Sequence, residues 1–564
     1  MKKLFKKEYT YILLLIAIST LAIYPLFKEG LYPFHDEPNI AHLHQMTRAL
    51  SEGQFPPRWI PDASYNFGNP YYIYFYHLPF YIGSLFNLLF GLTLISSFKL
   101  VIILSVFLSV ILFYLLMRRF FNPLVSLSSA SVYLFTPYRA VDIYVRGSFG
   151  EVWGFVFMPL ILLSLLRLSK ERSGKNVFLL GLGVFGLILS HNSSAFIFLP
   201  LAIIFGLILV FVSKYKKYVF KSLIFAFTLG IGLSAYYWMP AVIESKYIQP
   251  GSPFNLIDHF PFIRQLVIPS WGYGASVWGP DDGLSFQVGI LNLLLVLISP
   301  FSYLLFKDRW SKHKRALFSF SFTSFLLAIF FMNIRSLPLW NLIPLSTYIQ
   351  FPWRLLLLTT LFSSILGGFA IEALHKKFKY FYIPLVFVVL AIGLTWNYFK
   401  PEKIIKVDDD YYLRRFFANI TSEGRTDTLS DEYKNNIEDY LPVTIWTDER
   451  PLEVPKSKIE VLDGQVEFEE ISSTYYKAFV DSDKGTTLTL HSYYFPGWKA
   501  WVDGRESEII PQSPHGDMKL IIDPGEHSVV IRFTNTPVRT TSNLISLVTW
   551  TGMISYPLWR KRFS

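Results

Sequence analysis

Residues 97–119 read SFKLVIILSVFLSVILFYLLMRR, an apolar run that ends on Arg118 and Arg119. After Lys99 the run carries no charge until those two arginines. Its length is close to the roughly 20 residues that a helix needs to cross about 30 Å of hydrocarbon. Runs of this kind recur along most of the chain. The sequence therefore predicts a polytopic α-helical membrane protein.

The composition supports the same conclusion. Of 564 residues, 52% are hydrophobic, 18% aromatic and 16% charged, which is unusual for a soluble protein. The formal net charge of +11 comes from short clusters of Lys and Arg between apolar runs, a pattern typical of membrane topology rather than of nucleic-acid binding. We expect membrane lipids as partners and no nucleic acid. Because the chain contains no cysteine, disulfides and thiolate sites are excluded.

The basic clusters fix the expected orientation, because Lys and Arg collect on the cytoplasmic side. Counting every apolar run between Tyr71 and Thr136 as a crossing puts several clusters outside. All of them become cytoplasmic if residues 71–90, rich in Tyr and Phe, lie in the outer interface. This gives about twelve spans, near 9–27, 97–117, 121–136, 152–169, 177–191, 194–213, 222–240, 286–306, 316–332, 355–373, 381–398 and 542–559.

The expected domains follow from these spans. Residues 1–398 form a transmembrane domain with a long first external loop at 28–96, residues 399–541 an external soluble domain, and residues 542–564 a last span with a basic cytoplasmic tail. Alternation in 487–490 and 528–533 and turn signals at Asp503-Gly504 and 523–525 predict a β-sandwich-like second half of the soluble domain. The protein is expected in the plasma membrane with both termini cytoplasmic.

The first external loop holds an acidic motif, His35-Asp36-Glu37-Pro38. Ile40, Leu43, Thr47 and Leu50 follow at helical spacing, which predicts a short amphipathic helix along the membrane surface. A carboxylate at the start of that helix can act as a general base toward an acceptor hydroxyl. It can equally be an ordinary helix cap.

Other residues beside the acidic motif widen its possible chemistry. His44 and Arg48 follow Asp36 closely in sequence and, with His35, are candidate substrate contacts. Asp36 and Glu37 can also supply oxygen ligands to a divalent cation, although adjacent carboxylates without a spaced partner indicate a metal only weakly. We therefore assign no metal.

The second external loop, 138–151, mixes cations, carboxylates and aromatic rings. Arg139 and Arg146 are candidates for a bidentate phosphate contact, Tyr144 for a sugar or headgroup contact, and Glu151 for an acidic partner. The alternative is an interfacial belt in which the arginines snorkel and pair with Asp142 and Glu151.

Two further segments are expected at outer ends of spans. Trp353 and Arg354 follow Phe351-Pro352, where Arg354 can meet the phosphate of a lipid donor or of an ordinary phospholipid. His191 lies in a polar turn between two spans, where it can contact substrate or cap a helix.

At these residues the chain resembles the GT-C superfamily of membrane glycosyltransferases. More narrowly, Tyr144-Val145-Arg146-Gly147 with Glu151, residues 351–354, and residues 496–504 and 524–527 resemble YfhO-like proteins and those labelled membrane protein 6-pyruvoyl-tetrahydropterin synthase-related. The resemblance implies a GT-C-like fold and a polyprenyl-phosphate sugar donor. It also implies that Asp36 is the acceptor-activating base, Glu151 its second-loop partner, and Arg146 and Arg354 the donor-phosphate contacts.

The sequence-based hypothesis is therefore inverting sugar transfer from a polyprenyl-phosphate donor to a glycan, lipid or cell-envelope polymer outside the cell, with no cofactor required. One alternative is a catalytically silent membrane scaffold that binds glycan or lipid. Another is a flippase or transporter, which usually places ionisable residues near the bilayer midplane in matched halves. The sequence shows no such repeat.

Overall fold

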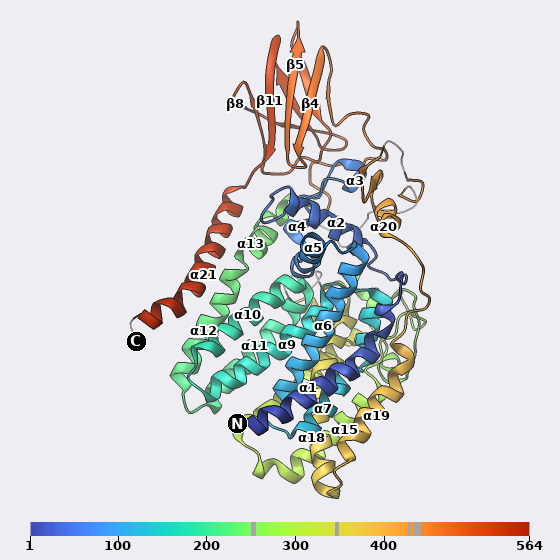
Figure 1. Ribbon diagram of the computed structural model, residues 1–564, viewed down its shortest axis with the longest axis vertical. Helices are drawn as coiled ribbons and strands as arrows, with labels where there is room; N and C mark the ends of the chain where they lie inside the picture. Colours follow the sequence, from blue (N-terminus) through green and yellow to red (C-terminus); the bar gives the residue numbers. More distant parts are fainter. Residues whose placement is uncertain (1, 250–254, 344–348, 427–429, 434–441, 563–564) are drawn as a thin grey trace. The chain divides into compact units, whose positions relative to one another are not determined.

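Contacts divide the chain into two compact units. The computed structural model (Figure 1) describes residues 2–249, 255–343, 349–426, 430–433 and 442–562. Unit 1 comprises Met1–Glu37, Lys99–Ile231 and Phe254–Lys406, and unit 2 comprises Pro38–Phe98, Gly232–Pro253 and Val407–Ser564. The grouping differs from the linear division at 398 and 541, because most of the first loop clusters with the C-terminal residues.

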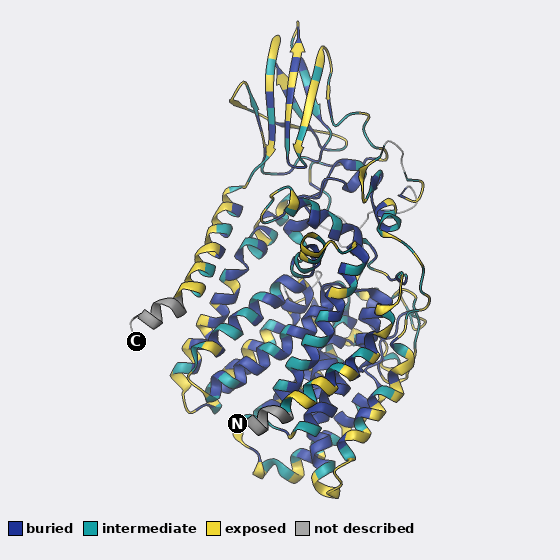
Figure 2. Ribbon diagram, in the orientation of Figure 1, coloured by how far each residue is buried: buried dark blue, intermediate teal, exposed yellow. Residues whose placement is uncertain are grey.

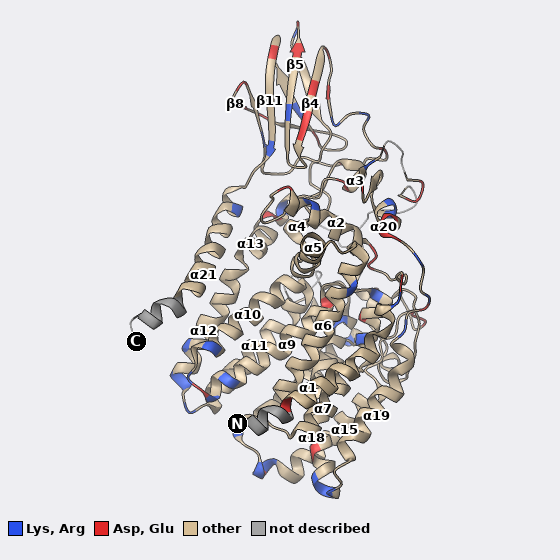
Figure 3. Cartoon of the chain, viewed as in Figure 1, with Lys and Arg blue, Asp and Glu red and all other residues tan. Residues whose placement is uncertain are grey.

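Unit 1 consists mainly of apolar helices, and Lys and Arg lie mostly at the helix ends (Figure 3). The longer helices are α1 (Lys2–Ile23), α6 (Leu94–Met117, which begins in unit 2), α7 (Pro123–Leu134), α9 (Glu151–Lys170), α10 (Gly174–Ser190), α11 (Asn192–Val212), α12 (Lys216–Leu233, which ends in unit 2), α15 (Ile290–Phe306), α16 (Lys312–Phe331), α18 (Leu356–Phe378) and α19 (Ile383–Thr395). The shorter ones are α8 (Pro137–Ala140), α14 (Ile263–Val267) and α17 (Leu337–Trp340).

Helix α18 is central to unit 1. It contacts α7, α9, α15, α16 and α19, and 94% of its most apolar window is buried, against 28% for α1 (Figure 2). Small and hydroxylated residues allow this close packing. Ser129 Oγ donates to the Ser364 carbonyl at 2.8 Å, and Asn292 Nδ2 donates to Ser363 Oγ at 2.8 Å. A Cβ at Gly368 would lie 2.4 Å from Met117 Cε.

A helix is present at every position where the sequence predicts a span. Among the described residues, seven stretches are long and apolar enough to cross a membrane, and the broken pair of α12 and α13 (Ala235–Ile243) would make eight. The apolar helices α7, α10 and α19 are shorter, and the described part of α21 (Pro537–Arg562) is not among these stretches. The count of about twelve crossings therefore stays a prediction. The seven stretches are Glu8–Phe27, Leu94–Met117, Glu151–Lys170, Asn192–Val212, Ile290–Arg309, Lys312–Phe331 and Pro352–Phe378.

Unit 2 contains the predicted β-rich region as two antiparallel sheets. One has the order β3-β6-β10-β9 and the other β4-β5-β11-β7-β8, and a short pair, β1 (Ile420–Thr421) and β2 (Gly424–Arg425), lies apart. The strands are β3 (Ile459–Val461), β4 (Gln465–Ser472), β5 (Tyr475–Ser482), β6 (Thr486–Leu490), β7 (Trp498–Val502), β8 (Arg505–Ser507), β9 (Ile510–Gln512), β10 (Asp517–Ile522) and β11 (Gly525–Phe533).

The strand signals in the sequence are confirmed. Residues 487–490 lie in β6 and residues 528–533 in β11. Asp503 and Gly504 both have positive φ and join β7 to β8 in a two-residue hairpin. Alternate residues of β5 are buried, and the core includes Tyr476, Val480 and Ile531 together with Trp59 from the first loop. Trp59 thus belongs to the sandwich core.

The helix expected after Asp36-Glu37 is confirmed as α2 (Pro38–Ser51), but its surroundings differ from those expected. Residues on its polar side, including His42 and Gln45, are buried along with the apolar ones. Helices α5 (Leu78–Phe90) and α20 (Asp409–Phe416) pack against it, and Thr47 Oγ1 donates to Ser84 Oγ of α5 at 3.0 Å. It is therefore a packed helix of unit 2. The remaining helices of this unit are α3 (Ala63–Asn66) and α4 (Tyr71–Tyr74).

The segment 71–90, expected in the interface, forms α4 and α5. Helix α5 has 13 residues, too few to cross about 30 Å at roughly 1.5 Å per residue. Its interfacial placement stays a prediction. In the connector that follows unit 1, Asp408 caps α20 by accepting from the Tyr411 amide at 3.0 Å, and residues 427–429 and 434–441 lie outside the described residues.

Candidate active site

The acidic loop and the second loop are joined by their backbones within unit 1. The His35 amide donates to the Val145 carbonyl at 3.0 Å, and the Asp36 amide donates to the Arg146 carbonyl at 2.9 Å. Gly147 follows with φ +63°, and a Cβ there would lie 2.0 Å from Phe34 Cδ2. Glycine is therefore required both by the left-handed backbone and by the close approach of Phe34.

A π-helical turn organises the second loop. Helix α8 runs directly into η2 (Val141–Arg146), which has π-helical backbone. Tyr138, Asp142 and Arg146 recur at intervals of four and project toward one another, and Gly147 ends the turn. Helix α9 then begins with Glu151. Such π-turns are frequent at functional sites.

Arg146 is the centre of a buried charge cluster. Its Nη1 donates to Asp142 Oδ1 at 2.5 Å and to Glu151 Oε2 at 2.7 Å, and its guanidinium lies 4.8 Å from the Trp353 ring centre. Tyr138 Oη donates to Glu151 Oε1 at 2.7 Å. Burial, together with the charge of Glu151, raises the pKa of Asp142 well above its usual value despite the opposing charge of Arg146. Asp142 therefore takes up a proton more readily than an exposed aspartate does.

Asp36 faces this cluster. Its side chain is half-buried, whereas Arg146, Asp142 and Glu151 are buried. Desolvation raises the pKa of Asp36, and the charges of Arg146, His35 and Arg354 oppose that rise. Glu151 adds to it. The result is a carboxyl more basic than an ordinary aspartate and still accessible to a small molecule.

Arg354 approaches the same cluster from another segment. It lies in η8 (Pro352–Leu355), the turn that leads into α18. Its Nη1 donates to Ser193 Oγ at 3.0 Å and to the Ile349 carbonyl at 2.7 Å, while its buried Nε has no hydrogen-bond partner among the described residues. Trp353 Nε1 donates to Ser276 Oγ at 3.2 Å. Arg354 thus retains a donor that an added anion could use.

His191 combines the two roles weighed from the sequence. Its Nδ1 accepts from the Ser194 amide at 3.3 Å and so caps α11. Its ring also interacts electrostatically with Glu151, Arg354 and Arg146. The capping role is confirmed, and substrate contact stays a prediction.

Two predicted contact residues, Arg139 and Tyr144, have structural partners elsewhere in unit 1. Arg139 is buried, donates to Ser109 Oγ at 2.8 Å, and lies over the rings of Tyr133 and Phe155. Tyr144 Oη donates to the Ala22 carbonyl at 2.6 Å, so its hydroxyl is used in helix packing.

Arg48 belongs to unit 2. It pairs with Asp62 at 2.7 Å, Glu52 at 2.8 Å and Glu470 at 3.1 Å, and Arg425 completes this network by pairing with Asp62 at 3.1 Å. His44 also lies in unit 2, close enough to Asp62 for their charges to interact.

The two neighbours of Asp36 differ in exposure. His35 is exposed, and its Nε2 lies 3.1 Å from the Tyr273 carbonyl oxygen. Glu37 is buried. Among the described residues, no group of three or more His, Asp or Glu side chains is arranged to hold a metal ion.

Two members of the site were not singled out from the sequence. Tyr138 holds Glu151, and Ser193 holds Arg354. Tyr138 lies in the loop 138–151, and Ser193 lies in the predicted polar turn that contains His191. The spacing of four between Tyr138, Asp142 and Arg146 is the signal that could have identified Tyr138; nothing in the local sequence identifies Ser193.

Comparison with known proteins gives a partial family match. Residues 72–258 match the model of the 6-pyruvoyl-tetrahydropterin synthase related domain, a membrane protein family. The expected resemblance to that family is confirmed over this stretch, which includes Arg146, Glu151 and His191. A relative described as an uncharacterized protein of Lactococcus lactis subsp. cremoris (strain MG1363) is 24% identical over 345 residues, covering 59% of this chain and 55% of the relative. This chain thus matches about half the length of that relative.

Two solved structures with partial similarity are an arabinofuranosyltransferase and an oligosaccharyltransferase. The arabinofuranosyltransferase AftD from Mycobacteria has a TM-score of 0.43 and 13% identity, over 71% of this chain and 27% of its own. The apo oligosaccharyltransferase of Archaeoglobus fulgidus has a TM-score of 0.43 and 12% identity, over 74% of this chain and 57% of its own.

Proposed function

We propose that the protein transfers a sugar from a polyprenyl-phosphate donor to an acceptor hydroxyl at the outer face of the plasma membrane. The observation that carries the proposal is the half-buried Asp36 carboxyl, which lies within electrostatic reach of Arg146 and Arg354. A base beside two cations is what transfer from a phosphate leaving group requires. The presence of apolar stretches long enough to cross a membrane supports a lipid-linked donor.

In the proposed reaction, Asp36 accepts the proton of the acceptor hydroxyl while the hydroxyl oxygen attacks the anomeric carbon. The bond from that carbon to the donor phosphate oxygen breaks, and its electron pair leaves on the phosphate. Attack from the face opposite the leaving group inverts the anomeric configuration. Arg354, whose Nε has no partner in the described part of the chain, stabilises the departing phosphate.

The other residues of the cluster have positioning roles in this scheme. Arg146 donates through Nη1 to Asp142 and to Glu151, and Tyr138 holds the second oxygen of Glu151. Arg146 therefore contributes positive potential and fixes, through its carbonyl, the backbone of Asp36. Trp353 covers the guanidinium and excludes water from it.

One observation favours the alternative of a catalytically silent scaffold. Because Asp142 and Glu151 already contact the Arg146 guanidinium, a donor phosphate must compete for it or rely on Arg354. A silent protein would bind the polyprenyl-phosphate sugar and the acceptor without turnover. The β-sandwich of unit 2 would then act as a glycan-binding module.

The experiment uses the full chain in nanodiscs with a polyprenyl-phosphate sugar and a panel of hydroxyl acceptors. We expect release of polyprenyl phosphate by the wild type, and a loss of about 10²-fold or more for Asp36→Asn. The matched control is Asp281→Asn in the same unit, whose side chain is 93% exposed. Undiminished turnover by Asp36→Asn would contradict the catalytic assignment. Donor binding without turnover by the wild type would favour the scaffold.

A further inference from the structure

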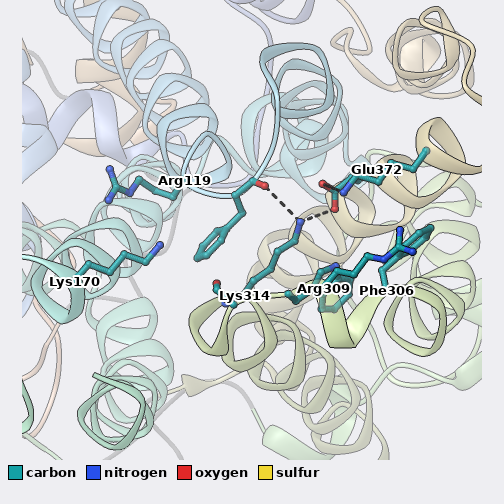
Figure 4. A pocket seen from close by; sticks show the side chains of 10 residues that line it. Arg119, Lys170, Phe306, Arg309, Lys314 and Glu372 are labelled. Carbon is teal, nitrogen blue, oxygen red and sulfur yellow. Dashed lines mark hydrogen bonds and ion pairs between the residues drawn. The ribbon is translucent and has the colours of Figure 1, made fainter. Parts of the chain in front are cut away.

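A second group of cations surrounds a cavity of about 370 Å³ in unit 1, at the end of the helices that carry the basic clusters (Figure 4). The turn that follows α6 and the ends of α9, α15, α16 and α18 meet there with the short turn η5 (Lys307–Arg309). The charged residues that line it are Arg119, Lys170, Arg309, Lys314, Glu372 and Lys376.

The acidic side chain in the lining is already engaged. Lys314 is buried and its Nζ donates to Glu372 Oε2 at 2.5 Å and to the Phe120 carbonyl at 3.4 Å, as Figure 4 shows. Lys376 Nζ donates to the other oxygen, Oε1, at 2.9 Å. Both oxygens of Glu372 are thus used, while the lining holds five cations to this one carboxylate.

The remaining cations are less well neutralised. Arg119 reaches Glu171, which lies outside the lining, at 3.3 Å, and its Nε has no partner among the described residues. Lys170 Nζ lies 4.6 Å from the Phe120 ring centre, on an aromatic face. Within the described part of the chain, neither Lys170 nor Arg309 has a carboxylate within 4 Å. The cavity therefore has excess positive charge.

We propose that this cavity binds a phosphate-bearing anion, the chemistry shared by an anionic lipid headgroup and a free phosphate ester. Basic pockets between membrane helices on the cytoplasmic side are suited to such headgroups. Phe306 and Trp310 line the same cavity and offer apolar contact to the part of a lipid next to its phosphate. This site is separate from Asp36 and does not depend on the proposed transfer reaction.

The competing explanation is that these residues only set membrane topology. Lys216 and Lys217 at the start of α12 are such a cluster; both are exposed and neither lines this cavity. They provide a matched control, because Lys216→Ala/Lys217→Ala and Lys170→Ala/Arg309→Ala each remove two positive charges. The Lys314–Glu372 pair stays intact in both double variants.

The test is native mass spectrometry of the full chain released from nanodiscs of phosphatidylglycerol mixed with phosphatidylcholine. We expect phosphatidylglycerol to be retained by the wild type and the α12 control, and retention at least tenfold lower in Lys170→Ala/Arg309→Ala. Titration with inorganic phosphate and with glycerol phosphate forms the second arm. Saturable binding of these small anions, lost in the same variant while lipid retention does not discriminate, assigns a free phosphate ester as the ligand.

Two results would overturn the proposal. One is equal retention and equal anion binding by the wild type and Lys170→Ala/Arg309→Ala, and the other is an equal loss in both double variants. Because Arg309 is exposed, Arg309→Ala alone provides the measurement if the double variant does not fold. The charge-keeping pair Lys170→Arg/Arg309→Lys is expected to retain the ligand.

Discussion

The backbone amide of Asp36 donates a 2.9 Å hydrogen bond to the carbonyl of Arg146. This bond ties the candidate base to the turn that carries the buried charge cluster. The position of the Asp36 carboxyl therefore depends on the backbone of 145–147 as much as on its own loop. Gly147 constrains that backbone, because a Cβ at this position would lie 2.0 Å from Phe34 Cδ2.

Gly147→Ala is expected to disturb both stability and transfer. A left-handed backbone costs an alanine about 1–2 kcal/mol, and the overlap of its Cβ with Phe34 adds an overpacking cost of about 1–3 kcal/mol. Gly91→Ala is the matched control, because its φ of +64° is nearly the same as the +63° of Gly147 while a Cβ there meets nothing within 4 Å. Thermal unfolding in detergent, followed by the donor-transfer assay, measures both effects.

The Phe34 contact can be tested separately. Because Phe34→Ala itself leaves a cavity, the comparison is between backgrounds: Gly147→Ala should destabilise the Phe34→Ala variant less than it destabilises the wild type. Equal unfolding temperatures for Gly147→Ala and Gly91→Ala would show that Phe34 does not constrain the turn.

The acid side of the pH profile should reflect Asp36. Desolvation raises its pKa, and a base is active only when deprotonated, so kcat/KM should rise with pH through a pKa above the ordinary value of about 3.9. Arg354 opposes that rise, so Arg354→Gln should move the acid limb to still higher pH. The profile of kcat/KM over pH 4 to 9, with Asp281→Asn as control, measures the shift. A limb that stays in place or moves to lower pH contradicts the interaction.

Donor affinity should separate Arg354 from Arg139, two of the three arginines predicted to bind phosphate. Arg354→Ala removes a cation with an unused donor and should weaken donor binding by about 1.5–3 kcal/mol, or about 10- to 150-fold. Arg354→Lys should recover part of it, since a point charge remains. Arg139→Met should instead lower the unfolding temperature with little change in donor Kd, because Arg139 lies between Tyr133 and Phe155. A large Kd change in Arg139→Met would restore its predicted role.

Local pattern was sufficient to predict much of the fold. Apolar runs and alternation predicted the helices and the strands β6 and β11, and the Asp503-Gly504 turn was confirmed. These features depend on neighbours in sequence, which periodicity reports directly.

What could not be predicted depends on distant partners. Arg48 follows Asp36 closely in sequence, yet its carboxylate partners include Glu470 from β4. Likewise, α2 reads as amphipathic, but its polar side is also buried: Gln45 donates to Asp62, and the His42 ring lies against the Tyr71 ring. No local pattern specifies which distant segment covers a helix. The partners of Arg48 and the burial of α2 therefore become known only from the tertiary contacts.

The unit 2 network makes a stability prediction that is independent of catalysis. Asp62 has a fully buried side chain and accepts hydrogen bonds from Gln45 at 2.8 Å, from Arg48 at 2.9 and 2.7 Å, and from Arg425 at 3.1 Å. Asp62→Asn removes the carboxylate and leaves both arginines with only their outer partners, Glu52 and Glu470. The expected loss is about 3 kcal/mol, the low end for breaking a buried pair, because the arginines are partly exposed.

The same network predicts a pH dependence. Although desolvation alone would raise the pKa of Asp62, Arg48 and Arg425 hold that pKa well below its ordinary value. The folded state therefore gains stability from the carboxylate above the unfolded pKa of about 3.9 and loses it as the pH falls toward the folded pKa. The difference in unfolding free energy between the wild type and Asp62→Asn should be constant near neutral pH and shrink below about pH 4. Asp281→Asn, with its exposed side chain, should match the wild type at neutral pH. A gap that widens on acidification would contradict the assignment of Asp62 as the ionised centre of the network.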